Sequence, residues 1–194
     1  MRRPFAAAIA ALLLASAAPA LAVAQQADPP ALFAAQKAAL APTAFMDGVW
    51  RGPAWSILPG GVKHEVTQTE RIGPFLDGSV KVFEGRGYNA DGTVGFNALG
   101  IMSYNPATKA WTLTSWAQGR SGVFPMTMTA DGYVWTVPAG PSATIRYTAV
   151  IGNGAWREIG EFMVEGQPPR QIFEMNLKRV GDTSWPAGGA VPKQ

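Results

Sequence analysis

The sequence predicts an all-β protein, a ten-stranded antiparallel up-and-down barrel preceded by a short N-terminal helix. Turn signals recur at nearly regular spacing between residues 59 and 169, and the runs between them are rich in β-branched and aromatic residues. No helical period of useful length interrupts these runs. Ten consecutive antiparallel strands favour closure, because an open meander would leave two long edges able to pair with other chains.

Residues 1–24 have the pattern of a secretory signal peptide. Arg2 and Arg3 precede an apolar run over residues 5–14, and small residues that suit cleavage follow at residues 20–24. A membrane-spanning helix would need about 20 uninterrupted apolar residues, whereas Ser16 and Pro19 interrupt this run. We therefore expect an exported protein, periplasmic or secreted, whose mature chain does not insert into a membrane.

The charge and cysteine content exclude several kinds of partner and site. Without the leader, 14 basic residues face 13 acidic ones, and no Lys/Arg cluster remains to follow a phosphate backbone. Nucleic acid is therefore not an expected partner. The absence of cysteine excludes disulfides, thiolate metal sites and a lipid anchor on an N-terminal cysteine.

The remaining chain divides into three parts. Residues 25–44 form an N-terminal helix and linker, in which Asp28 stands at the capping position, Pro29 at the first helical position and Pro42 at the expected stop. Residues 45–180 form the barrel, which opens with Gly48-x-Trp50-x-Gly52. In the tail, residues 181–194, Trp185 is expected to fold back over the barrel.

Strand alternation predicts which side chains face the interior. In the second strand these are Val62, His64, Val66, Gln68, Glu70 and Ile72, and in the third strand Val80, Val82, Glu84, Arg86 and Tyr88. Later strands contribute apolar candidates, namely Phe96, Ala98, Met102, Phe124, Met126, Met128, Tyr133, Trp135, Val137, Ile145, Tyr147, Ala149, Phe173, Met175 and Leu177. The expected interior is an apolar cavity with one polar wall.

The candidate ligand-binding residues combine this polar wall with aromatic and apolar positions. They are Trp50, His64, Gln68, Glu70, Glu84, Arg86, Phe96, Trp135, Tyr147 and Met175. A barrel of ten strands is wide enough to keep a cavity. A pocket of about 300 Å³ or more would favour binding or catalysis, whereas a packed interior would favour a scaffold.

Several short motifs carry a family resemblance. The Gly48-x-Trp50-x-Gly52 element, Thr69-Glu70-Arg71-Ile72, the segment 96–105 and the segment 173–180 resemble an uncharacterised family of exported bacterial domains. That resemblance implies a calycin-like barrel, similar to lipocalins and fatty-acid-binding proteins and more distantly to nitrobindins. It covers residues 45 to 180 and implies a binding barrel for a small, apolar or lipid-like ligand.

The nitrobindin resemblance raises the question of haem. In that family a histidine near the C-terminal strand ligates the haem iron, whereas Gln171 to Val180 contain no histidine. His64, on the second strand, is the only histidine, and Met175 would be a weak substitute. We expect no cofactor and rank haem below an apolar ligand.

The sequence offers little support for an enzyme. One histidine, no cysteine and no Gly-x-Ser-x-Gly leave no signal for a nucleophile triad. Glu70 and Glu84 could form an acid/base pair beside Arg86, but a buried salt bridge among the three is the preferred interpretation. His64, Gln68 and Glu70 make a poor metal site, so no catalytic or metal-binding residue is predicted.

Four functions follow from these observations. The first is an exported barrel that binds a small, largely apolar molecule. The alternatives are an interaction barrel with a filled interior, a barrel isomerase or cyclase, and a haem-binding protein of the nitrobindin kind.

Overall fold

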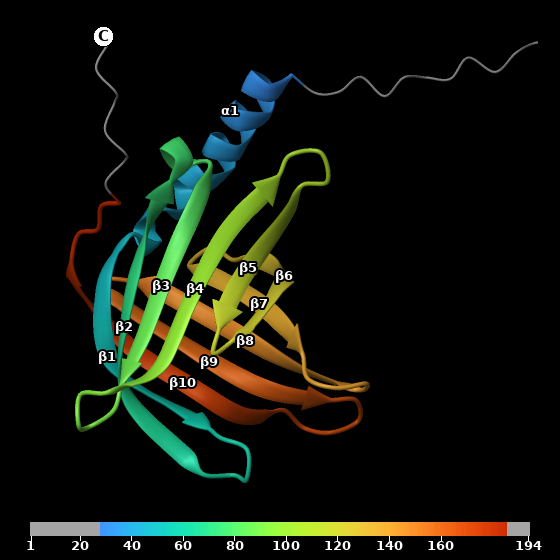
Figure 1. Ribbon diagram of the computed structural model, residues 1–194. Helices are drawn as coiled ribbons and strands as arrows, with labels where there is room; N and C mark the ends of the chain where they lie inside the picture. Colours follow the sequence, from blue (N-terminus) through green and yellow to red (C-terminus); the bar gives the residue numbers. More distant parts are fainter. Residues whose placement is uncertain (1–27, 186–194) are drawn as a thin grey trace, which may run out of the picture.

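The protein is a closed antiparallel barrel in which each strand pairs with its neighbours in sequence and β1 pairs with β10 (Figure 1). The computed structural model describes residues 28–185, so the predicted leader and the last nine residues lie outside the described part. The strands are β1 (Gly48–Ile57), β2 (Lys63–Phe75), β3 (Val80–Tyr88), β4 (Val94–Asn105), β5 (Ala110–Ala117), β6 (Arg120–Met128), β7 (Gly132–Pro138), β8 (Ala143–Gly152), β9 (Ala155–Val164) and β10 (Arg170–Gly181). The predicted ten-stranded up-and-down barrel with a short N-terminal helix is confirmed.

Tight turns separate the strands where the sequence carries turn residues. The β5–β6 hairpin turns through Gln118 and Gly119, which both have positive φ, and the β8–β9 hairpin turns through Asn153 and Gly154 in the same way. Two consecutive residues with positive φ match the right-handed twist of the flanking strands. These turns hold the register that decides which side chains enter the barrel.

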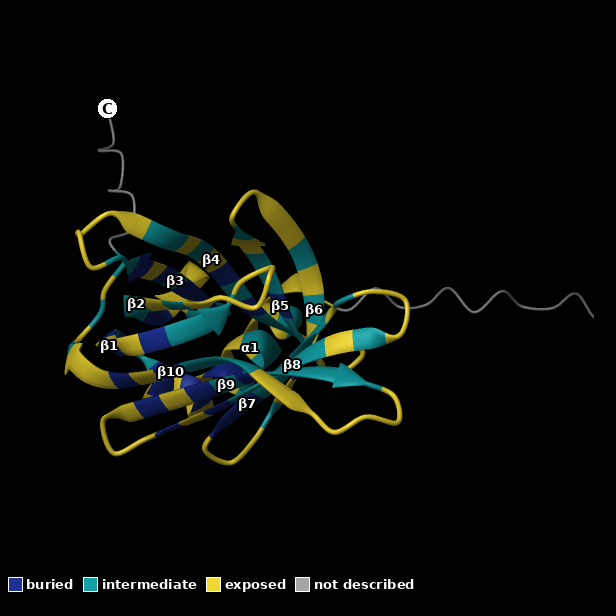
Figure 2. Cartoon of the chain, turned by 90° about the horizontal axis from the view of Figure 1, so that it is seen from below, coloured by how far each residue is buried: buried dark blue, intermediate teal, exposed yellow. Residues whose placement is uncertain are grey.

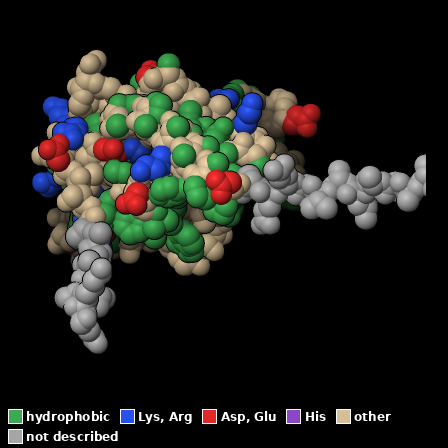
Figure 3. All heavy atoms as spheres, turned by 90° about the horizontal axis from the view of Figure 1, so that it is seen from above, with side chains coloured by type: hydrophobic (Ala, Val, Ile, Leu, Met, Phe, Trp, Pro, Cys, Tyr) green, Lys and Arg blue, Asp and Glu red, His purple; other side chains and the backbone are tan. Residues whose placement is uncertain are grey.

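The N-terminal segment closes one end of the barrel, which we call the closed end. It consists of α1 (Pro29–Leu40) and a 3-10 helix, η1 (Ala41–Met46), which contacts both β2 and β8. Figure 2, seen from the opposite, open end, shows α1 behind the ring of strands, and Figure 3 shows hydrophobic and charged side chains mixed over the closed end. None of the described helices is long and apolar enough to cross a membrane.

Two details of this segment differ from the prediction. Asp28 makes no side-chain capping hydrogen bond. The α-helix ends at Leu40, before Pro42, as predicted, but the chain continues directly into the 3-10 helix η1 with Pro42 in its first turn. A proline there lacks only an N–H that would have no intrahelical partner in any case.

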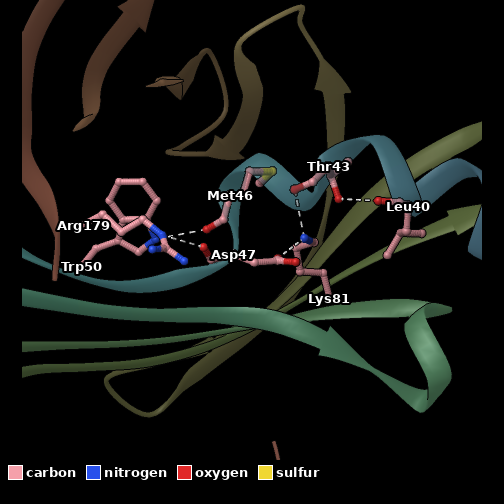
Figure 4. A network of polar contacts seen from close by, with 7 residues as sticks. All are labelled: Leu40, Thr43, Met46, Asp47, Trp50, Lys81 and Arg179. Atoms are coloured by element: carbon pink, nitrogen blue, oxygen red, sulfur yellow. Dashed lines mark hydrogen bonds and ion pairs between the residues drawn. The ribbon is translucent and has the colours of Figure 1, made fainter. Parts of the chain in front are cut away.

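Polar contacts attach η1 and the following residue, Asp47, to the barrel (Figure 4). The Lys81 ammonium donates to the Thr43 carbonyl at 2.9 Å and pairs with the Asp47 carboxylate. The Trp50 indole N–H donates to the Met46 carbonyl at 3.0 Å, and Arg179 donates to the Asp47 carbonyl at 3.1 Å. Residues 29–47, which we call the plug, are therefore attached to β1, β3 and β10.

Buried side chains fill the closed half of the barrel. Its largest fully buried side chains include Trp50, Trp156, Met46, Ile72, Met102, Ile151 and Leu177. Trp50 is 1% exposed, and its ring meets that of Trp156 edge to face at 5.9 Å between centroids. Such edge-to-face pairs add to the free energy of burial itself. The remaining hollow part of the barrel lies toward the open end.

The predicted inward faces are confirmed on most strands but wrong on β3. Lys81 and Phe83 are buried in the interior, whereas Glu84 and Arg86 lie on the outer face with Arg71. Apolar residues occur on both parities of β3, so alternation did not distinguish the faces. The inward positions beyond Phe83 are Gly85 and Gly87, which leave space that neighbouring side chains occupy.

Candidate functional site

The barrel encloses a cavity of about 500 Å³ that extends from the packed half to the open end. Its lining includes residues beside three hairpins at that end, such as Leu58, Gly95 and Gln118. Most of the wall is apolar or aromatic, as is usual for pockets that take small molecules. The volume exceeds the roughly 300 Å³ at which a binding interior becomes the better interpretation.

Glu70 on β2 provides the first polar group of the cavity. Its carboxylate accepts a hydrogen bond of 2.6 Å from the amide of Gln68, two residues earlier on the same inward face. The carboxylate occupies the space that Gly85 leaves on β3, because a Cβ at Gly85 would lie 2.6 Å from Glu70 Oε1. A glycine at this position therefore creates the recess that Glu70 fills.

Glu158 on β9 provides the second polar group, and the sequence interpretation missed it. The side chain is buried at 5% exposure and accepts hydrogen bonds from Tyr133 Oη at 2.9 Å and from Trp135 Nε1 at 3.1 Å. Each carboxylate oxygen thus has one donor from β7. The alternation of Trp156, Glu158, Gly160 and Phe162 was the signal that could have placed Glu158 inside.

Both carboxyl groups hold their protons more strongly than ordinary glutamates. Burial raises the pKa of Glu70 to about 8, the nearby Glu158 adds to the rise, and the bond from Gln68 opposes it. Burial likewise raises the pKa of Glu158, against the bonds from Trp135 and Tyr133. Near neutral pH Glu70 is therefore largely protonated.

Glu158 contributes to the raised pKa of Glu70, and both side chains line the same cavity. Strands β2 and β9 are not neighbours in the barrel, since β1 and β10 separate them. Burial raises the pKa of Tyr133 well above its ordinary value, and the nearby Glu158 and Glu70 add to the rise. We call Glu70 and Glu158 the carboxyl pair.

An aromatic wall extends from the carboxyl pair toward the open end. Trp135 stacks on Tyr147 with ring centroids 4.4 Å apart and an interplanar angle of 15°. Phe124 packs against Trp135, and Phe173 packs against Tyr147. Gly160 permits this arrangement, because a Cβ there would lie 2.8 Å from the Tyr147 ring. Burial raises the pKa of Tyr147 to about 12, so its hydroxyl stays protonated.

The predicted site residues divide into three groups. The cavity lining contains His64, Gln68, Glu70, Phe96, Trp135, Tyr147 and Met175. Trp50 belongs to the packed core of the closed end instead, and Glu84 and Arg86 lie outside the barrel. The proposed contact of Glu70 with Arg86 is therefore wrong, because a β-strand directs successive side chains to opposite faces.

No lysine or arginine is among the residues that line the cavity. The ion pairs Arg71–Glu84, Arg86–Glu84, Arg146–Glu161 and Arg157–Glu174 lie on the outer face, and Lys81 is engaged with Asp47 at the closed end. Within residues 28–185, neither member of the carboxyl pair forms a salt bridge with a basic side chain. The cavity thus has two acidic groups and no cationic partner for them.

Among the described residues, His64 is the one imidazole that lines the cavity. His64 Nε2 lies 2.9 Å from the Asn89 side-chain oxygen, and residues 171–180 offer no imidazole to the interior. The cavity lining also has no lysine or arginine to pair with haem propionates. No group of three His, Cys, Asp or Glu residues that could hold a metal occurs in the described part of the chain.

A second hollow, of about 670 Å³, lies on the outer surface. Its lining includes Arg71, Glu84, Trp116 and Trp185, and the Arg71 guanidinium lies 3.4 Å from the centroid of the Trp185 ring. Trp185 therefore folds back over the barrel as the sequence predicts. We take the interior cavity as the candidate site, because it contains the buried polar side chains of Gln68 and Glu158 within a mostly apolar wall.

Comparison with known proteins supports the fold alone. No protein-family model matches the chain, and no curated protein matches it by sequence. Among solved structures, the chain is similar to the crystal structure of Rv2717c from M. tuberculosis, at 15% sequence identity and a TM-score of 0.54. The match covers 75% of this chain and 97% of that one. At this identity the likeness concerns the barrel and says nothing about a ligand.

Proposed function

We propose that this protein is an exported barrel that binds a small, largely apolar molecule in its interior cavity. The observation that carries the proposal is the cavity of about 500 Å³, with its aromatic wall and the carboxyl pair. An enclosed apolar pocket with a few convergent polar groups is the usual form of a small-molecule site. Export is supported by the leader pattern of residues 1–24.

The hollow half of the barrel favours this function over a scaffold with a filled interior. The buried apolar residues of the barrel form one cluster, so the barrel has a hydrophobic core in addition to the cavity. A cavity lined by aromatic rings and carboxyl groups offers packing contacts and hydrogen bonds to a molecule bound inside it.

Titration with the uncharged dye Nile red tests the proposal. We expect one molecule of dye to bind each chain with enhanced fluorescence, because the cavity excludes water from an apolar guest. Ala98→Trp should abolish binding, since Ala98 lines the cavity. Leu99→Trp, one residue along β4 and 39% exposed, should leave binding unchanged.

Equal dye binding by the Ala98→Trp and Leu99→Trp variants, or no binding by the unmodified protein, would contradict the proposal. Haem provides the contrast for the nitrobindin alternative. We expect no stoichiometric Soret shift when haem is added, because His64 is engaged with Asn89.

A further inference from the structure

We infer that the ligand of the cavity is an organic cation, a small apolar molecule with a protonated amine that is held between Glu70 and Glu158. The inference rests on the proposed function and names the chemical class of its ligand. It follows from the charges that line the cavity, from the hydrogen-bonding capacity that remains there, and from the aromatic wall.

The first argument is the imbalance of charge. The lining contains two glutamates and no lysine or arginine, whereas the glutamates of the outer ion pairs have basic partners. A ligand with a carboxylate would meet two acidic groups in a poorly solvated space and find no cation to stabilise it. A ligand with an ammonium group would lie beside two carboxyl groups that can ionise and pair with its charge.

The second argument is the direction of the hydrogen bonds. The Gln68 amide donates to Glu70, and the Tyr133 hydroxyl and the Trp135 indole donate to Glu158. These donors hold the carboxyl oxygens as acceptors, and each oxygen has a second lone pair available. An ammonium group has three N–H donors, so the number of its hydrogen bonds matches the acceptors that two carboxylates offer.

The third argument is the aromatic wall beside Glu158. Trp135 donates its N–H to Glu158, and its ring stacks on Tyr147. The faces of indole and phenol rings attract cations, most strongly where water is excluded. The same wall also offers apolar surface to the hydrocarbon part of such a molecule.

Binding of a cation should change the protonation of the site. The titratable groups that line the cavity are His64, Glu70, Tyr133, Tyr147 and Glu158, and Glu84 acts on Glu70 from the outer face. In the free protein Glu70 is largely protonated at neutral pH, since its pKa lies at about 8. An ammonium beside it favours the carboxylate, so a proton leaves the carboxyl group for the solvent when the cation binds.

The test uses three probes with one aromatic skeleton and different charges: 1-naphthylmethylamine, 1-naphthalenemethanol and 1-naphthoic acid. We expect calorimetric titration of the full chain at pH 7 to show about tenfold or tighter binding of the amine than of the alcohol. The acid should bind most weakly. Titrations of the amine in two buffers of different ionisation enthalpy should show net proton release.

Isosteric variants test whether Glu70 and Glu158 cause the preference for the amine. In a Glu70→Gln, Glu158→Gln double variant the amine should bind no more tightly than the alcohol. Glu84→Gln is the matched control, because it removes a carboxylate from the outer face of the neighbouring strand and should preserve the preference. Proton release by the unmodified protein checks the inference even if the double variant does not fold.

Three outcomes would overturn the inference. The alcohol or the acid could bind the unmodified protein as tightly as the amine, the preference for the amine could survive the double substitution, or the amine could bind without proton release. In each of these cases the cavity still binds a small molecule, so the proposed function stands. Failure of all three probes and of Nile red to bind would instead refute the proposed function and the inference with it.

Discussion

Lys81 and Arg86 lie on the same strand, β3, but their side chains point to opposite sides of the barrel wall. Lys81 is 2% exposed and contacts Thr43 and Asp47, whereas the Arg86 side chain is 47% exposed beside Glu84. Burial lowers the pKa of Lys81, and the hydrogen bond and the charge of Asp47 oppose this effect. A buried charge of this kind depends on its partner far more than a solvated one does.

We therefore predict that Lys81→Ala lowers the free energy of unfolding by about 3 kcal/mol or more, since it leaves Asp47 and the Thr43 carbonyl without their donor. Arg86→Ala should lower it by less than about 1 kcal/mol, because exposed ion pairs contribute little. Urea denaturation of both variants measures the difference. Lys81→Met separates loss of the charge from loss of packing, and equal effects of the two alanine variants would contradict the placement of these side chains.

The raised pKa of the Glu70 carboxyl group makes the free energy of unfolding depend on pH. Its pKa is about 8 in the folded protein and near 4.5 in an unfolded chain. Between these values the folded state holds a proton that the unfolded state has lost, so the free energy of unfolding falls as pH rises through this window. Burial of Glu158, whose pKa is also raised, acts in the same direction.

Replacing Glu70 with glutamine should remove its part of this pH dependence. We predict that unfolding midpoints of Glu70→Gln decline less than those of the unmodified protein between about pH 5 and pH 8. Thermal unfolding at a series of pH values measures this, with Glu84→Gln as the control from the outer face. Parallel pH profiles for the unmodified protein and Glu70→Gln would show that the buried carboxyl group is not protonated in the folded state.

At the scale of elements, the contact between β1 and β10 closes the barrel. The register shifts between Val49 and Trp50, and the two backbones approach closely at Gly52. A Cβ at Gly52 would lie 2.0 Å from the Asn176 carbonyl oxygen, which is backbone and cannot move aside as a side chain could. Glycine is thus required where the first and last strands meet.

Gly52→Ala should consequently lower the free energy of unfolding by about 1 to 3 kcal/mol, since relief of the clash requires a backbone shift. Gly181 pairs with Val49 across the same two strands, but a Cβ there meets no atom within 4 Å. We expect Gly181→Ala to have little effect. Denaturant midpoints of the two variants test this, and a neutral Gly52→Ala would mean that the two strands are farther apart at this point.

At the scale of the whole molecule, the two halves of the barrel have different roles. The closed half holds the two buried tryptophans, Trp50 and Trp156, and the plug tied down by Lys81 and Asp47. The open half holds the cavity, the carboxyl pair and the aromatic wall. Burial of carboxyl groups without a partner of opposite charge destabilises the open half. The hydrophobic core of the closed half offsets this cost.

The sequence by itself determined the fold class, the number of strands and the inward faces of most of them. These features depend on turn residues and on a period of two, which are local properties of the chain. The inward placement of Gln68 and Glu70 belongs to this group, since polar and apolar positions on β2 are clearly ordered around them. The same reasoning failed for Glu84 and Arg86, because β3 has glycines at inward positions and apolar residues on both faces.

Only the tertiary structure decided which inward side chains meet. Trp50 points inward as predicted, yet it is part of the core, because η1 fills the end of the barrel where that residue lies. Glu158 lines the same cavity as Glu70 because closure of the barrel places β2 and β9 around one interior, although 87 residues lie between the two glutamates in the chain. Alternation assigns a side chain to a face, but the depth at which it lies and the partner that it meets depend on closure of the barrel and on the plug.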